Sequence, residues 1–272
     1  MSTAFVTSRA NPRVKQLRAA FNGHARLSGG LVAIEGEHLL FEAMRSGLVF
    51  KTIFVSDRRN VPDWVPNNVE LIELTDDVFA SVVDTRSPQG LAALLVPPKW
   101  ALKDAVPPNT TPLLLVAAGL QDPGNVGTLI RSAEAFGATA VLTTAGTVSE
   151  WNQKALRASA GSVFRVPVVQ VTAEDLISLK SSGVRLIAAV APESASKPAI
   201  VDAPFADLGG ACALMIGNEG AGLVAEWLEL ADTRITIPMP GRVESLNAAV
   251  AGSLLLYEAA RQRSASQRTT DV

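Results

Sequence analysis

The sequence has very few of the residues that build disulfides, metal centres and histidine-based catalytic triads. Its 272 residues include one cysteine, Cys212, and two histidines, His24 and His38. A single cysteine leaves no partner for an intrachain disulfide, and its place in the apolar run ACALMIG indicates a reducing compartment. Both histidines lie far along the chain from any acidic or cysteine cluster. We therefore expect no metal site and no Ser-His-Asp triad.

Long hydrophobic segments are also missing. The longest apolar runs, LLLVAAGL and LIAAVA, are too short to cross a bilayer, and the N-terminus lacks the apolar core of a secretion signal. These absences argue against a membrane-spanning protein and predict a cytoplasmic one, with an organellar location as the alternative.

Acidic residues are absent from the N-terminal segment, although the whole chain has a net charge of −2. No Asp or Glu precedes Glu35, whereas five basic residues do: Arg9, Arg13, Lys15, Arg18 and Arg26. The overall charge gives no sign of nucleic-acid binding. On charge alone, the basic segment is either a solvated helix face or a contact with nucleic acid.

Residues 1–97 have the pattern of a small α/β domain. NPRVKQLRAAF predicts a helix capped by Asn11, and the segments LVAIEG, KTIFVS, VELIEL and GLAALLV have the composition of strands. The stretch from Pro97 to Pro112 has five prolines and little periodicity, so we assign residues 98–112 to a semi-rigid linker.

Residues 113–272 have the pattern of a second α/β domain. Apolar strands such as LLLVAAG, RLIAAVA and CALMIG alternate with helices, two of which are expected at residues 126–136 and 245–263. Continuously apolar strands are typical of a parallel sheet covered on both faces, so this domain is predicted to be Rossmann-like. In such sheets, ligands bind at the loops that follow the strands.

Three of these loops are rich in Gly, Asn and Pro: LQDPGNVGTLIRSAEAFGA, LMIGNEGAGL and ITIPMPGRVESLNAAVAG. Each loop alone has an ordinary explanation, such as a helix cap or a solvated side chain. Together they carry five polar side chains among small and aliphatic neighbours: Asn125, Arg131, Glu219, Ser245 and Asn247. This combination indicates a small-ligand site at one edge of the sheet.

The glycines Gly217, Gly220 and Gly222 suggest a phosphate-binding turn. Their spacing is G-x-x-G-x-G, which differs from the G-x-G-x-x-G of nicotinamide dinucleotide sites. Glu219 also lies within the turn, where its carboxylate would repel a phosphate. A nicotinamide-dependent oxidoreductase is therefore disfavoured.

The three loops resemble the signature motifs of the SpoU (TrmH) family of RNA ribose 2′-O-methyltransferases, in the SPOUT superfamily. The N-x-G-x-x-x-R motif is matched by Asn125 and Arg131, and the G-N-E-G motif begins at Gly217. The I-P-M-x-G-x-x-x-S-L-N motif runs from Ile237 to Asn247. The resemblance covers residues from about 113 to 261. The N-terminal domain is similar, more weakly, to the family's RNA substrate-binding domain.

The resemblance implies properties that residue patterns cannot supply. It implies a deep trefoil knot in the C-terminal domain, a homodimer, and S-adenosylmethionine as cofactor. The residues expected at the cofactor, mainly through backbone groups, are Ala189, Gly217, Ile237, Met239 and Leu246. For Ile237 and Leu246, a role as simple core residues explains the sequence equally well.

In the family, Arg131 corresponds to the catalytic residue that is often assigned as a general base. A guanidinium normally stays protonated, so we favour phosphate binding and stabilisation of the developing alkoxide. By resemblance, Ser245 and Asn247 orient the ribose or Arg131, whereas Asn125 and Glu219 brace the loops. For Glu219 a purely structural role is the alternative.

The resemblance also favours RNA as the partner of the basic residues Arg9, Arg13, Lys15 and Arg18. Arg157 is expected to contact RNA or the partner subunit. The alternative is an ordinary residue at a helix terminus. We expect 23S ribosomal RNA as the target. The alternatives are transfer RNA and a non-catalytic RNA-binding protein of ribosome assembly, but the latter should lack Arg131 or the Ser245 and Asn247 pair.

Overall fold

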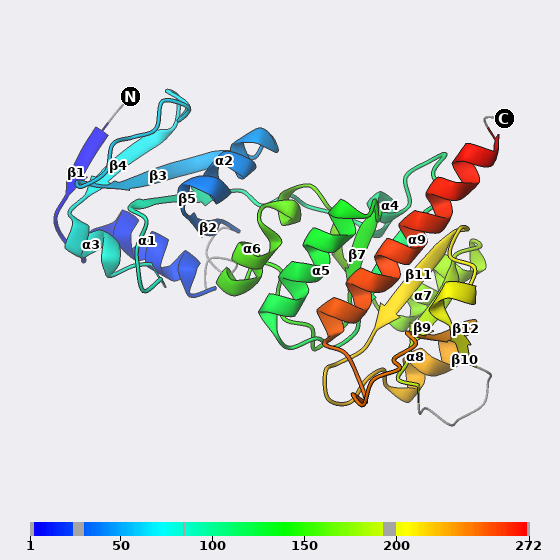
Figure 1. Ribbon diagram of the computed structural model, residues 1–272. Helices are drawn as coiled ribbons and strands as arrows, with labels where there is room; N and C mark the ends of the chain where they lie inside the picture. Colours follow the sequence, from blue (N-terminus) through cyan, green and yellow to red (C-terminus); the bar gives the residue numbers. More distant parts are fainter. Residues whose placement is uncertain (1–2, 24–29, 84, 193–199, 271–272) are drawn as a thin grey trace. The chain divides into compact units, whose positions relative to one another are not determined.

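The chain folds into two compact units, each described here by itself. The computed structural model describes residues 3–23, 30–83, 85–192 and 200–270, so His24 and Arg26 lie outside the described residues. Unit 1 comprises Met1–Lys99 and Trp151–Phe164, and unit 2 comprises Trp100–Glu150 and Arg165–Val272. Figure 1 shows the elements of both units.

Unit 1 is built on a mixed five-stranded sheet of order β1-β4-β3-β5-β2. The strands are β1 (Thr3–Val6), β2 (Val32–Glu35), β3 (Phe50–Ser56), β4 (Glu70–Leu74) and β5 (Leu91–Leu95). Strand β5 runs antiparallel to β2 and β3, whereas β1, β4 and β3 are parallel. The sequence pattern predicted four of these strands. It did not predict the short edge strand β1.

Three helices pack on this sheet: α1 (Pro12–Phe21), α2 (Glu37–Arg45) and α3 (Asp76–Ala80). Helix α1 begins as expected, because the side chain of Asn11 accepts a hydrogen bond from the backbone N–H of Arg13 at 2.8 Å. Its apolar residues Leu17 and Phe21 join Phe54 and Phe79 in the buried core of the unit. The apolar residues of α1 recur at helical spacing because one face of the helix packs into this core.

A segment from the second half of the chain completes unit 1. It contains α6 (Gln153–Ser159) and a single 3₁₀ turn, Ser162–Phe164, whereas the sequence pattern assigned the whole of 113–272 to the C-terminal domain. The buried amide of Gln153 donates to the carbonyl of Ala33 on the edge strand β2 at 2.9 Å. Because the two residues are 120 positions apart, no local pattern could reveal this pairing.

The expected linker is partly structured. It contains the short helix α4 (Leu102–Ala105), and Ala105 is fully buried in the core of unit 2. The carbonyl of Ala105 also accepts a hydrogen bond from the Thr139 hydroxyl at 2.8 Å. From Trp100 onward, the segment 98–112 is therefore part of unit 2.

Unit 2 contains a seven-stranded sheet of order β10-β12-β9-β11-β6-β7-β8, in which every pairing is parallel. The strands are β6 (Leu113–Ala117), β7 (Ala140–Thr143), β8 (Val168–Gln170), β9 (Arg185–Ala189), β10 (Ile200–Asp202), β11 (Cys212–Ile216) and β12 (Thr233–Thr236). The parallel α/β fold predicted from the apolar strands is confirmed. The three-residue edge strand β10 was not predicted.

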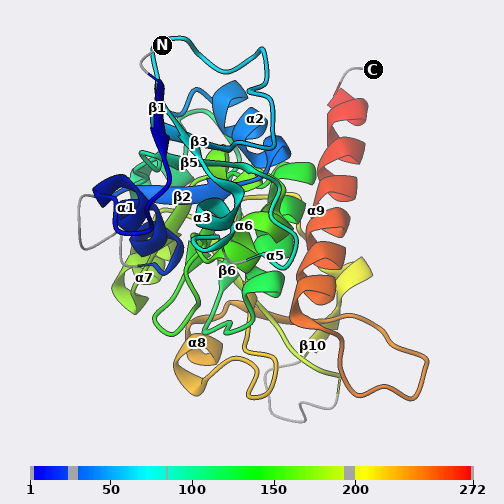
Figure 2. The ribbon, with the colours of Figure 1, turned by 90° about the vertical axis from the view of Figure 1, so that its left-hand side faces the viewer.

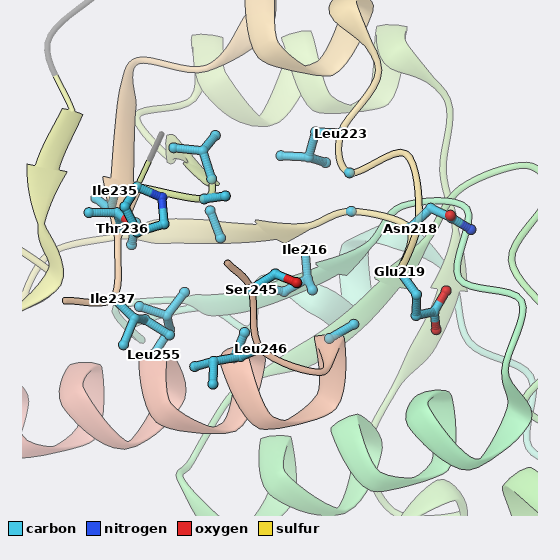
Figure 3. Close-up of a pocket in the computed structure, with 18 of the residues that line it drawn as sticks. Ile216, Asn218, Glu219, Leu223, Ile235, Thr236, Ile237, Ser245, Leu246 and Leu255 are labelled. Carbon is cyan, nitrogen blue, oxygen red and sulfur yellow. The ribbon is translucent and has the colours of Figure 1, made fainter. Parts of the chain in front are cut away.

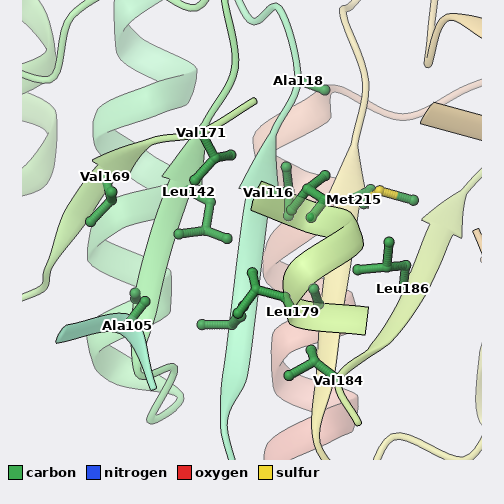
Figure 4. Close-up of a cluster of buried hydrophobic side chains, with 14 of the residues drawn as sticks. Ala105, Val116, Ala118, Leu142, Val169, Val171, Leu179, Val184, Leu186 and Met215 are labelled. Atoms are coloured by element: carbon green, nitrogen blue, oxygen red, sulfur yellow. The ribbon is translucent and has the colours of Figure 1, made fainter. Parts of the chain in front are cut away.

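Helices cover both faces of this sheet. Helices α5 (Pro123–Ala135) and α9 (Ala248–Thr270) pack together on one face. Helices α7 (Ala173–Ser181) and α8 (Ala225–Leu230) pack on the other, where Leu179, Val116 and Met215 share a core cluster. Figure 4 shows this cluster between the strands and α7, with α9 behind the sheet. This burial on both faces is why the strands carry no polar alternation.

Two helices begin at other residues than the sequence pattern predicted. Helix α5 begins at Pro123, because the carboxylate of Asp122 caps it by accepting from the backbone N–H of Asn125 at 2.9 Å. Helix α9 begins at Ala248 rather than Ser245, and its cap is Asn247, whose side-chain oxygen accepts from the N–H of Ala249 at 2.9 Å. The expected trefoil knot stays a prediction. Among the described helices, none has the length and apolarity that a bilayer crossing requires.

Candidate active site

A cavity of about 430 Å³ opens at the carboxyl ends of β9, β11 and β12, wholly within unit 2. Its walls include all five residues expected at the cofactor: Ala189, Gly217, Ile237, Met239 and Leu246. Residues 190–192, the loop 218–223 and the first turns of α9 also contribute to the lining. Figure 3 shows Leu223 on one side of the cavity and Leu246 and Leu255 on the other. The predicted convergence of the second and third loops is therefore present.

The loop after β11 forms a tight hairpin that only glycine permits at its base. The N–H groups of Asn218 and Gly222 each donate to the other residue's carbonyl, at 3.0 and 2.9 Å. A Cβ atom at Gly217 would lie 2.2 Å from the carbonyl carbon of Gly222, well inside contact distance. The side-chain oxygen of Asn218 accepts from the N–H of Gly220 at 2.9 Å, which closes the turn. The loop that forms this part of the cavity wall is thus closed by its own hydrogen bonds.

The Asn218 amide also anchors this hairpin to the rest of the sheet edge. Its Nδ2 donates to the carbonyl of Gly119, just after β6, at 3.0 Å. Asn218 is the second residue of the G-N-E-G motif, and the sequence pattern predicted no role for it. Its signal was the family motif itself, since an isolated asparagine in a turn is unremarkable.

A chain of hydrogen bonds links the polar residues of all three motifs. The Nδ2 of Asn125 donates to a carboxylate oxygen of Glu219 at 2.7 Å. The Oδ1 of Asn125 accepts from the Nδ2 of Asn247 at 3.0 Å. Asn125 thus uses both ends of its amide to hold two loops that are 94 and 122 residues away along the chain.

Ser245 lines the cavity, whereas Arg131 does not. Arg131 is exposed on α5, six residues after Asn125, which corresponds to about 9 Å along the helix axis. Within the described part of the chain its side chain has no hydrogen-bond or ion-pair partner. The structure therefore brings Asn125, Glu219, Ser245 and Asn247 to the cavity or to its edge and leaves the Arg131 guanidinium free at the surface.

The cavity lining has one charged side chain, Glu219, and three uncharged polar ones, Asn218, Thr236 and Ser245, among apolar residues and glycines. Across the described residues there is no cluster of three or more His, Cys, Asp or Glu side chains that could hold a metal ion. The single cysteine lies on β11, away from the lining, and burial raises the pKa of the Cys212 thiol. Cys212 is therefore a core residue rather than a nucleophile.

The basic residues predicted to contact RNA differ in their surroundings. The Arg13 guanidinium forms a 3.0 Å ion pair with Glu70, and Arg18 donates to the hydroxyl of Ser81 at 3.4 Å. Arg9 reaches the carbonyl of Asp77 at 3.5 Å. Lys15 and Arg157 are exposed and have no partner among the described residues.

Two family models match the chain. The SpoU rRNA Methylase family matches residues 112–257, and an MRM3-like substrate binding domain matches residues 11–93. The first match covers the three motifs and all of the cavity-lining residues.

The chain belongs to the SpoU rRNA methylase family.

Relatives of this SpoU chain match it along almost its whole length. It is 35% identical to the 23S rRNA (guanosine(2553)-2′-O)-methyltransferase RlmP of Bacillus subtilis, over 93% of this chain and 97% of that protein. It is 29% identical to the 23S rRNA (uridine(2479)-2′-O)-methyltransferase of Streptomyces viridochromogenes, over 97% of this chain and 94% of that protein.

Solved SpoU structures have the same fold. The AdoMet-bound rRNA methyltransferase of Sinorhizobium meliloti superposes with a TM-score of 0.82 and 29% identity, over 95% of this chain and 98% of that chain. The SpoU methyltransferase AviRb of Streptomyces viridochromogenes, in complex with AdoMet, has a TM-score of 0.81 and 28% identity, over 93% and 98% of the two chains.

Proposed function

We propose that the protein transfers a methyl group from S-adenosylmethionine to a ribose 2′-hydroxyl of 23S ribosomal RNA. The observation that carries this proposal is the cavity, which is lined by two of the three family motifs and joined to the first by the Glu219–Asn125–Asn247 hydrogen bonds. Membership in the SpoU family, together with relatives named as 23S rRNA 2′-O-methyltransferases, supports the reaction and the target.

The cavity suits this cofactor better than a dinucleotide. Its walls offer apolar side chains and backbone groups of Gly217, Ile237 and Leu246, which can enclose a nucleoside. The one charged side chain in the lining, Glu219, is an anion. A carboxylate is compatible with a cationic sulfonium but would repel the pyrophosphate of a nicotinamide dinucleotide. The lining therefore supports S-adenosylmethionine over the oxidoreductase alternative.

S-adenosylmethionine, when bound, supplies a methyl group that is already activated on a positively charged sulfur. We propose that Ala189, Gly217, Ile237, Met239 and Leu246 hold it, mainly through their backbones. Because the leaving group departs as a neutral thioether, we propose that the protein needs no metal. What remains for the protein is to orient the ribose hydroxyl and to manage its proton.

Each polar residue has a proposed part in that task. Arg131, which is exposed and has no side-chain partner in the described ranges, binds a phosphate of the RNA and stabilises the charge that develops on the hydroxyl oxygen. Ser245, on the cavity wall, orients the ribose. Asn125 and Glu219 brace the loops through their mutual hydrogen bond, and Asn247 links this pair to the start of α9.

The two-unit architecture favours ribosomal over transfer RNA. The rRNA relatives match across both units, whereas the Aquifex aeolicus TrmH/SpoU tRNA-modifying enzyme covers only 61% of this chain, with a TM-score of 0.50. We propose that the N-terminal unit binds the RNA, through Arg9, Arg13, Lys15, Arg18 and Arg157. Lys15 and Arg157 are the most available, because neither side chain has a partner among the residues that the structure describes.

We further propose that the protein acts in the cytoplasm as a homodimer. Helix α9 exposes three large apolar side chains, Val250, Leu254 and Tyr257, at the i, i+4 and i+7 spacing of one helix face. An apolar stripe of this kind is expected where a second subunit covers it.

The function is tested by methylation of purified ribosomal RNA and transfer RNA with radiolabelled S-adenosylmethionine. We expect label in 23S rRNA, at a ribose identified by its resistance to alkaline cleavage, and none in tRNA. Calorimetry should detect binding of S-adenosylmethionine and not of NAD. Label in tRNA alone would replace the proposed target, and binding of RNA without any methyl transfer would favour the non-catalytic alternative.

A further inference from the structure

The loop that joins β12 to α9 lies at the edge of the cavity with its middle in solvent. Both flanks line the cavity, through Ile237 and Met239 before the bend and Ser245 and Leu246 after it. The residues between them, 240–244, are all exposed. Figure 2 shows this orange loop extending away from the start of α9. Any nucleotide whose ribose enters the cavity must pass close to such a loop.

Little within the described part of the chain holds this loop in place. None of residues 238–246 forms a backbone hydrogen bond with another described residue. An element with a solvated backbone can adapt to a bound partner at small cost in internal structure. The hairpin at Gly217 is the opposite case, because its own hydrogen bonds close it.

The chemistry at the tip of the loop is that of a phosphate contact. The Arg242 side chain is exposed and has no hydrogen-bond or ion-pair partner among the described residues. Arg242 is three residues from both Met239 and Ser245, so at most about 11 Å of extended chain separates it from either lining residue. The lining itself contributes only the negative charge of Glu219, which would repel RNA phosphates. Along residues 238–246, Arg242 is the one cation and Glu244, two positions further on and also exposed, is the one anion.

We propose that Arg242 is a positioning residue that binds a backbone phosphate of the RNA beside the target nucleotide. Arginine suits this role, because its planar group can donate two parallel hydrogen bonds to one phosphate. The neighbouring Val243, which is 61% exposed, packs against the adjacent ribose or base. Arg131 on α5 and Arg242 on the β12–α9 loop then hold the RNA from two different elements. This inference rests on the proposed function.

The test compares Arg242→Ala, Arg242→Lys and Val243→Ser with the full-length protein in single-turnover methylation of the RNA that the unaltered protein methylates. Lys103→Ala is the matched control, because Lys103 is an exposed cation without a described partner on α4, which packs at the amino end of β7. The RNA concentration for half-maximal rate is measured between 0.05 and ~0.3 M salt, and S-adenosylmethionine affinity is measured by calorimetry.

We expect Arg242→Ala to raise the half-saturating RNA concentration about five- to eightfold at ~0.1 M salt, which is the contribution of one phosphate contact. The slope of log affinity against log salt should become shallower by about one contact, and Arg242→Lys should restore that slope. Val243→Ser should weaken RNA binding with no change in slope. S-adenosylmethionine affinity and the rate at saturating RNA should stay at the level of the unaltered protein and of Lys103→Ala.

Three results would overturn the inference. An unchanged salt slope in Arg242→Ala would show that Arg242 makes no phosphate contact. Loss of S-adenosylmethionine affinity would assign the loop to the cofactor site instead. A change in molecular mass by light scattering would make the loop a subunit contact. If the unaltered protein methylates no RNA at all, the proposed function fails first, so the two failures are distinguishable.

Discussion

Asn125 illustrates how a side-chain amide meets a demand that a carboxylate or an apolar side chain could not. Its amide donates to Glu219 and accepts from Asn247 at the same time. An aspartate could not donate to Glu219 and would place two carboxylates together, and an apolar residue could do neither. The asparagine in the first motif is therefore explained by the geometry of three loops rather than by its place near a helix start.

Arg131 leads to a prediction at the residue scale. Arg131→Lys should lower the single-turnover rate about 100-fold, because an ammonium keeps the charge but loses the fixed fork of donors. The change should leave S-adenosylmethionine affinity intact, since Arg131 does not line the cavity. Rapid-quench methylation with saturating RNA and cofactor measures the rate.

Lys103→Arg serves as the control for Arg131→Lys, because it exchanges the same two side chains at an exposed position remote from the cavity. A near-normal rate in Arg131→Lys would leave the guanidinium with no special part in the reaction. A positive charge at position 131 would then be enough for the reaction.

At the scale of elements, the packing of α5 against α9 holds the site together. Ser132 and Ser253 share a hydrogen bond of 2.7 Å between the two helices. At the carboxyl end of α5, the rings of Phe136 and Tyr257 pack edge to face, with 5.8 Å between their centroids. These contacts fix the register of the two helices. Asn125 lies in the first turn of α5, and Asn247 directly precedes the first turn of α9. The hydrogen bond between those two residues depends on this register.

The close approach of the helices requires Gly252. A Cβ atom at Gly252 would lie 2.4 Å from Cδ2 of Leu129 and 3.4 Å from Ile216, and Leu129 is fully buried. We expect Gly252→Ala to destabilise the protein by about 1–2 kcal/mol, because overpacking of about 1–3 kcal/mol exceeds the gain in helix propensity of up to ~1 kcal/mol. Denaturant unfolding, followed by circular dichroism, measures the free energy.

Gly241→Ala is the comparison for Gly252→Ala, because a Cβ at Gly241 would meet nothing within 4 Å. Its free energy of unfolding should stay within about 0.5 kcal/mol of the unaltered protein. If Gly252→Ala proves equally neutral, Leu129 has room to move and the register is not fixed at this point.

At the scale of the whole molecule, the exposed apolar face of α9 leads to a prediction about the proposed homodimer. Leu254→Asp should convert the proposed homodimer to a monomer, because it places a charge in an apolar interface. Light scattering after gel filtration measures the mass. Ile177→Asp is the matched control, since Ile177 is 47% exposed, close to the 45% of Leu254, but lies on α7 across the sheet.

A monomeric mass for the unaltered protein would refute the homodimer directly. A dimeric mass for Leu254→Asp would place the interface on another face. The apolar residues of α9 would then have no partner from a second copy of the chain.

The sequence by itself determined the class of this protein and the part of the cavity wall that its motifs form. Apolar strands separated by helices predicted the parallel sheet of unit 2, because a strand buried on both faces has no reason to alternate. The family motifs pointed to Gly217, Ile237, Met239 and Leu246, which line the cavity, because tight turns at such a site restrict the residues that fit them.

Only the tertiary structure decided which residues meet across long separations. The attachment of Gln153 to strand β2 and the bonds that join Asn125 to two distant loops depend on partners remote in sequence. Local patterns record the preferences of a few neighbouring residues. Such contacts arise from the folded backbone as a whole, so their partners could not be predicted from those patterns alone.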